Sequence, residues 1–255
     1  MTAMTEPRSD TGPDPLLVVR TSDRVTLTLH RPSRHNALDV ATVEALHQVL
    51  DDIDRTGTRM LVLEGAGPSF CSGFDLSDID SETDGSLLLR FVRIELLLQR
   101  LFRAPYHTVA LAHGRTFGAG ADLFCACQHR FAAPDTTIRF PGTNFGLVLG
   151  SGRLAARVGV DSALALLRSA RPIEANAAKA SGLAGEIVAI DERAARLDRL
   201  ARDESPIEPE TFDLILQLAL PASDQNDLAN LVRSAARPGL KRRIMNYAAA
   251  RNRSR

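Results

Sequence analysis

The first half of the chain alternates short apolar runs with polar turns, which is typical of strands. The two runs at residues 60–65 and 108–114 end in glycine and suit buried strands, although periodicity alone does not exclude helix there. A polar stretch at residues 21–24 predicts a turn between the first two runs. The predicted strands lie at residues 16–19, 25–30, 60–65, 108–114 and 130–133.

Helical spacing of apolar residues appears at residues 40–53, with Asp39 as a candidate cap, and at residues 87–102. Small apolar residues at 121–127 predict a short buried helix, and the polar residues 81–86 predict a loop. From Gly150 onward the pattern is almost entirely helical. Strands and crossovers followed by helices favour an α/β architecture.

Two glycine-rich turns follow predicted strands and precede segments that can begin helices. The first turn is residues 70–76, which include Gly73, and the second is residues 113–123, which include Gly118. Helix starts leave backbone N–H groups unpaired, so two such turns can aim donors at one point. Converging N–H groups stabilise an acyl oxygen that takes on negative charge, which points to chemistry on a thioester or a similar carbonyl. Tight packing of the turns alone is the alternative.

Four segments in the same order resemble the crotonase superfamily, also called the enoyl-CoA hydratase/isomerase family. They are an Arg-Pro…Asn-Ala-Leu segment at residues 31–38, the two glycine turns, and a Phe-Pro-Gly…Gly segment at residues 140–150. Each motif is weak alone, whereas four in register are specific. The resemblance implies repeated β-β-α units in a crotonase-like core at residues 16–190 and a helical C-terminal region at residues 191–255.

The resemblance also implies which groups form an oxyanion hole. The donors would be the backbone N–H groups of Phe74 and Ala119, and each donor would be worth about 3 kcal/mol to a thioester enolate. Asp75 would hold the first turn rather than take part in chemistry. The alternative is that Phe74 and Ala119 are ordinary turn residues.

Hydratases of this family place two glutamates over the substrate, and this chain departs from that pattern. Asp122 occupies the first position with a shorter carboxylate, as the candidate catalytic residue, or it is a helix cap. Gly142 occupies the second position and leaves it vacant, because glycine has no side chain that donates or accepts.

Other polar residues lie near these positions. Thr143, Asn144 and Ser151 are close in sequence to the vacant position. His113 precedes the second turn and can titrate near neutral pH, although a packed histidine bonded to backbone is the favoured interpretation.

Coenzyme A enters as part of the substrate, by resemblance, and no permanently bound cofactor is expected. Arg31 and Arg34 are candidates for its phosphates, because guanidinium groups suit phosphate oxygens, or they are solvated surface residues. The basic stretch at residues 237–243 is a further candidate for the nucleotide of a neighbouring subunit, or a solvated helix start. The family resemblance implies a homo-trimer or hexamer.

Composition narrows the setting of the protein. The 255 residues fit one domain. Because 31 basic residues balance 31 acidic ones, the chain has no net positive charge that would indicate binding to nucleic acid. No apolar run reaches membrane-spanning length, and residues 1–15 are expected to form a disordered tail without a signal peptide. Cys71, Cys125 and Cys127 suggest reduced thiols in a cytoplasmic protein, and no spacing typical of a metal site occurs.

The sequence therefore predicts an acyl-CoA enzyme of the crotonase type, nearest to an enoyl-CoA hydratase (a lyase) or an isomerase. The alternative is a homologue that binds acyl-CoA with little or no hydratase activity, because Gly142 removes the second acid.

Overall fold

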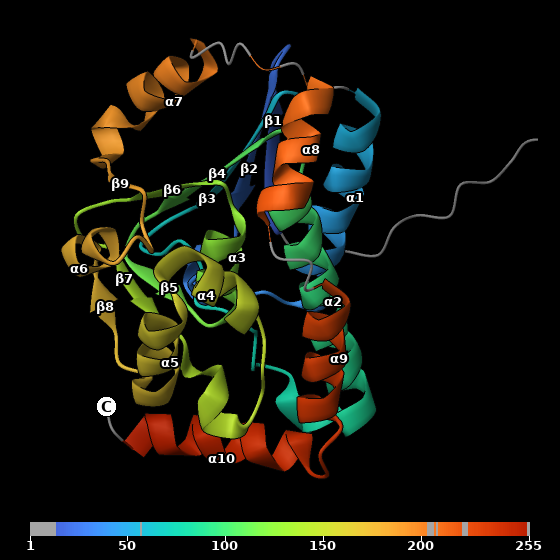
Figure 1. Ribbon diagram of the computed structural model, residues 1–255. Helices are drawn as coiled ribbons and strands as arrows, with labels where there is room; N and C mark the ends of the chain where they lie inside the picture. The colour runs from blue at the N-terminus through green and yellow to red at the C-terminus, as the bar shows by residue number, and fades with distance from the viewer. Residues whose placement is uncertain (1–13, 57, 203–206, 208, 221–223, 254–255) are drawn as a thin grey trace, which may run out of the picture.

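The computed structural model describes residues 14–56, 58–202, 207, 209–220 and 224–253. The predicted N-terminal tail, residues 1–15, lies outside the described residues except for its last two. The elements form a mixed α/β architecture in which helices surround two sheets (Figure 1). The predicted fold class is therefore confirmed.

The main sheet has six strands in the order β1-β2-β3-β4-β6-β9. Its first pair is antiparallel and its other pairs are parallel. Parallel strands place their carboxyl ends at one edge, and both glycine turns begin beyond that edge. The strands are β1 (Leu16–Arg20), β2 (Arg24–Leu29), β3 (Met60–Gly65), β4 (His107–Ala112), β6 (His129–Ala132) and β9 (Glu186–Ile187).

A second sheet has three strands in the order β5-β7-β8 and carries the second glycine turn. The sequence pattern did not predict it, because its strands are only two or three residues long and show no usable period. They are β5 (Arg115–Phe117), β7 (Thr137–Arg139) and β8 (Ile173–Glu174).

Ten α-helices are present among the described residues, and the four C-terminal ones follow the main sheet in the chain (Figure 1). Asp39 caps the first helix as predicted, because its carboxylate accepts the Thr42 N–H at 2.8 Å. The helices are α1 (Val40–Thr56), α2 (Asp84–Arg103), α3 (Ala119–Ala126), α4 (Ser151–Val158), α5 (Val160–Ser169), α6 (Ala175–Ala180), α7 (Arg193–Arg202), α8 (Pro209–Ala219), α9 (Asp224–Ala235) and α10 (Leu240–Arg253).

The predicted loop at residues 81–86 is wrong in its second half, where α2 begins at Asp84. A capping box explains the early start: the Thr83 hydroxyl accepts the Ser86 N–H at 3.0 Å, and the Ser86 hydroxyl accepts the Thr83 N–H at 2.8 Å. The helix then buries an apolar face that includes Leu87 and Phe91. Of these two residues, Phe91 lines the candidate site.

Candidate active site

The two glycine turns are packed directly against each other. A Cβ atom at Gly73 would lie 2.6 Å from the carbonyl oxygen of Phe117 and 3.1 Å from the amide nitrogen of Ala119. Gly73 also has a backbone φ of +93°, which residues other than glycine rarely adopt. Glycine is therefore required here for both space and conformation, and it lets the backbones of the two turns meet.

Hydrogen bonds hold this contact in one register. The Phe117 N–H donates to the Cys71 carbonyl at 2.9 Å, and the Cys71 N–H donates to the Arg115 carbonyl at 3.1 Å. A Cβ at Gly120 would lie 2.3 Å from the same Cys71 carbonyl, so α3 begins in close contact with the first turn. The turns thus form one backbone unit.

The predicted donors, Phe74 and Ala119, line one cavity together with Gly118. Ala119 is the first residue of α3, so its N–H has no partner within the helix. Neither N–H donates to another backbone group among the described residues. Two unpaired donors on packed turns at one cavity are the arrangement that binding an oxyanion needs.

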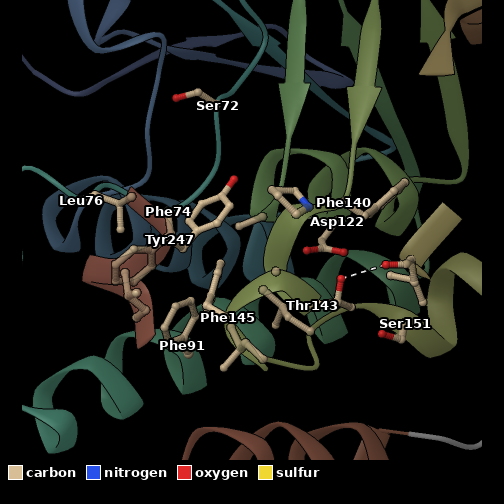
Figure 2. Close-up of a pocket in the computed structure, with 18 residues that line it drawn as sticks. Ser72, Phe74, Leu76, Phe91, Asp122, Phe140, Thr143, Phe145, Ser151 and Tyr247 are labelled. Carbon is tan, nitrogen blue, oxygen red and sulfur yellow. Dashed lines mark hydrogen bonds between the residues drawn. The ribbon is translucent and has the colours of Figure 1, made fainter. Parts of the chain in front are cut away.

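Apolar and aromatic side chains form most of the cavity wall. In Figure 2 the aromatic residues Phe74, Phe91, Phe145 and Tyr247 gather on one side, opposite Ser151, whereas Phe140 lies beside Asp122. Phe74 stacks on Phe91 with ring centroids 4.3 Å apart, which fixes the ring beside its own N–H. Such a wall suits an acyl chain and excludes water.

The Asp122 carboxyl lies on the cavity side opposite this aromatic group (Figure 2). The residue is only 4% exposed, and its carboxyl makes no hydrogen bond to a described residue. It lies against Gly150, because a Cβ there would be 2.1 Å from its Oδ1. Burial raises the pKa of Asp122 well above its ordinary value, while Arg153 opposes the rise and Glu95 adds to it. The Asp122 carboxyl therefore holds its proton more tightly than an exposed aspartate does.

Gly142 lies in the 3-10 helix at Pro141–Phe145 and lines the same cavity. Its φ is not positive, and a Cβ would find its nearest atom, the Leu147 carbonyl oxygen, at 3.7 Å. The position predicted for a second acid therefore has room for a side chain. Asp122 is the one ionisable carboxyl among the described residues that line the cavity.

The other polar candidates do not replace that acid. Thr143 and Ser151 line the cavity, but the Thr143 hydroxyl donates to the Leu167 carbonyl at 2.8 Å. Asn144 is not among the lining residues. His113 bonds the Gly67 carbonyl through Nε2 at 2.8 Å, as expected of a packed histidine.

Arg31 holds the first turn from behind. Its guanidinium lies 2.7 Å from the Asp75 carboxylate and 3.2 Å from that of Asp39. Burial opposes ionisation of Asp75, but hydrogen bonds from Ser77 and Arg31 outweigh it and lower the pKa of Asp75. These contacts agree with the expectation that Asp75 holds the first turn. Arg34, the other arginine of this segment, is exposed.

Several cavity residues were not predicted from the sequence. Ile244 and Tyr247 come from α10, and Phe91 comes from α2, far along the chain from the turns. In the sequence, their apolar or aromatic character within helical segments indicated burial but not a place in the cavity. All three cysteines are buried and unpaired, and no cluster of potential metal ligands occurs in the described part of the chain. None of its helices is both long and apolar enough to cross a bilayer.

Comparisons with known proteins agree with this fold. The family model for enoyl-CoA hydratase/isomerase matches residues 22–203. A Bordetella parapertussis crystal structure of the enoyl-CoA hydratase/isomerase type superposes with a TM-score of 0.89 and 44% identity, over 92% of this chain and 98% of that one. A probable enoyl-CoA hydratase from Bacillus subtilis (strain 168) is 33% identical over 201 residues, 75% of this chain and 76% of its own length.

A third relative has a different named reaction. An ethylmalonyl-CoA decarboxylase from Danio rerio is 35% identical over 164 residues. The match includes 62% of this chain and 54% of that protein, so the chain spans about half of that relative's length.

Replacing Asp122 by Asn should stabilise the fold in a pH-dependent way. Because the folded-state pKa is raised, the wild type loses stability as pH rises above the ordinary value of 3.8 and through the folded pKa. Within that window the variant should gain up to about 1.4 kcal/mol per pH unit over wild type. Urea unfolding at about pH 4.5 and about pH 8 measures the free energies, with the exposed Asp78→Asn as control. A stability gap that is the same at both pH values contradicts a buried neutral Asp122.

Proposed function

The chain belongs to the enoyl-CoA hydratase/isomerase family, the crotonase superfamily, and on that premise we propose that it moves one proton at the α-carbon of an acyl-CoA thioester. The Phe74 and Ala119 N–H groups would bind the thioester oxygen and stabilise the enolate. Asp122 would exchange the proton. Among the reactions of the family, isomerisation of an enoyl-CoA fits this site better than hydration.

One observation supports this choice: the cavity that holds the two N–H groups is lined by a single carboxyl among the described residues, with glycine at position 142. Hydration needs one group to activate water and another to deliver a proton to the α-carbon. Isomerisation needs only one group, because the proton removed from carbon 2 can return at carbon 4. A cavity with one acid–base group therefore favours isomerisation over hydration.

In the proposed reaction, ionised Asp122 takes a proton from carbon 2 of a 3-enoyl-CoA. The electrons of the broken C–H bond pass into the thioester, whose oxygen becomes the oxyanion bound by both N–H groups. Protonated Asp122 then donates to carbon 4, which leaves the double bond between carbons 2 and 3. A raised pKa suits this role, because an acid–base group works best with a pKa near the operating pH.

Decarboxylation of a malonyl-type CoA thioester is the second candidate, and the raised pKa of Asp122 favours it. Loss of carbon dioxide leaves the C–C electron pair as an enolate, so no base is needed. A protonated Asp122 could then donate directly to the α-carbon. The Danio rerio relative carries the name of such an activity.

Recognition of coenzyme A and assembly are further parts of the proposal. Arg34 is the better phosphate candidate, because Arg31 already pairs with Asp39 and Asp75. By analogy with the family, we expect a homo-trimer or hexamer and a cytoplasmic location, with no permanently bound cofactor.

Three assays separate the candidate reactions. Purified wild type is given a 3-enoyl-CoA, crotonyl-CoA and a 2-alkylmalonyl-CoA, and products are separated by chromatography. We expect isomerisation to dominate, and Asp122→Asn to lower it by about a hundred- to ten-thousandfold, whereas the exposed Asp78→Asn leaves it unchanged. Faster hydration would identify a hydratase, and decarboxylation alone would support the second candidate. Tight binding of acyl-CoA without any turnover would identify a non-catalytic binding homologue.

Restoring the absent acid should add hydration. Gly142→Glu places a carboxyl where space and backbone conformation permit one, so hydration of crotonyl-CoA should rise by about a hundredfold. Gly142→Ala is the control for the loss of glycine, because it adds a Cβ without a carboxyl. If a folded Gly142→Glu protein hydrates no faster than Gly142→Ala, the vacant position does not explain weak hydration.

A further inference from the structure

A buried ion pair lies near Asp122, although neither of its members lines the cavity. Arg153 of α4 and Glu95 of α2 form an ion pair in which each side chain is 1% exposed. The Arg153 Nη2 donates to Glu95 Oε2, and Gln99 donates to the other Glu95 oxygen at 2.9 Å. Glu95 therefore has a partner on each oxygen.

Arg153 is less completely satisfied than Glu95. Its Nε and Nη1 make no hydrogen bond to any described residue, although both are buried. Its second ion-pair partner in the described chain is Asp227 of α9, whose carboxylate lies 3.6 Å from Nη1. A buried guanidinium with unused donors is costly, so its retention needs a reason beyond the pair with Glu95.

The first turn of α4 connects this ion pair to the Asp122 carboxyl. Gly150, the N-cap of α4, touches the Asp122 carboxyl, and Arg153 follows three residues later on the same turn. The buried Asp122 carboxyl likewise makes no hydrogen bond to a described residue. The charged groups that face Asp122 are Arg153 from α4 and Glu95 from α2, with Asp227 from α9 behind Arg153 and the Cys125 thiol on its own helix.

We infer that Arg153 and Glu95 are positioning residues that let Asp122 change its charge inside a dry site. When Asp122 is neutral, Glu95 and Asp227 balance the charge of Arg153. When Asp122 ionises, Arg153 supplies a nearby positive charge and Glu95 limits how far that stabilisation goes. The pair thereby gives Asp122 an intermediate proton affinity. It is lower than that of a buried acid with no charged neighbour and higher than that of an acid in a salt bridge. This inference rests on the proposed role of Asp122 as the proton carrier.

The two members of the pair act on the charge of Asp122 in opposite directions. Attraction by Arg153 lowers the pKa of Asp122, and repulsion by Glu95 raises it. Removing either charge should therefore shift the titration of Asp122 in a predictable sense. A packing defect alone would give no such sign.

The test is a titration of Asp122 by infrared spectroscopy, which requires no turnover. The protonated carboxyl gives a C=O band, assigned by its loss in Asp122→Asn, and the band is followed with pH. Glu95→Gln should lower the midpoint by about one pH unit or more, and Arg153→Gln should raise it by a similar amount. Arg153→Lys keeps the charge and should restore most of the wild-type midpoint.

Asp227→Asn guards against variants that fail to fold, because its side chain is 14% exposed and the Arg153–Glu95 pair stays intact. It should also lower the midpoint. Asp224→Asn is the matched control on α9, since Asp224 pairs with Arg103, and it should leave the midpoint unchanged. Midpoints that do not move, or that move in the same direction in Glu95→Gln and Arg153→Gln, overturn the inference. Opposite shifts in a protein that turns over none of the three substrates would uphold the charge coupling and refute the proposed function instead.

Discussion

The site depends on the close approach of two backbone turns at Gly73. The carbonyl of Phe117 and the amide of Ala119 occupy the space that any side chain at Gly73 would need. That contact brings two unpaired N–H groups to one cavity, and it forms only because β3 and β4 are parallel neighbours whose carboxyl ends share one edge. The donors are thus positioned by backbone packing rather than by their own side chains, which explains why Phe and Ala are acceptable at positions 74 and 119.

Two arginine–carboxylate contacts surround this unit and have different consequences. Arg31 and Asp75 brace the first turn from outside the cavity, where hydrogen bonds lower the pKa of Asp75 and fix it as an anion. Arg153 and Glu95 lie in the interior near Asp122, where burial dominates and raises the pKa of Asp122. One charged contact makes the turn rigid, and the other leaves a carboxyl able to gain and lose a proton.

The sequence was sufficient for the features that depend on local chemistry. Glycines after apolar runs predicted both turns, and Asp39 predicted the start of α1, because each is governed by residues within a few positions. The features it did not reveal depend on distant partners. Glu95 and Arg153 are 58 residues apart, and Glu95 lies within an apolar helix pattern that gave no sign of a partner. The pairing of Arg31 with Asp75 is likewise visible only in three dimensions, as is the contribution of α10 to the cavity.

The most direct test of the central claim is the carbonyl stretch of a bound thioester. An acyl-CoA labelled with carbon-13 at the thioester carbonyl is added to the protein, and isotope-edited infrared difference spectra isolate that band. If the Phe74 and Ala119 N–H groups bind the oxygen, the band should fall to lower frequency than in free acyl-CoA, because two hydrogen bonds polarise the carbonyl. A band that keeps its solution frequency while the ligand is bound would contradict an oxyanion hole at these turns.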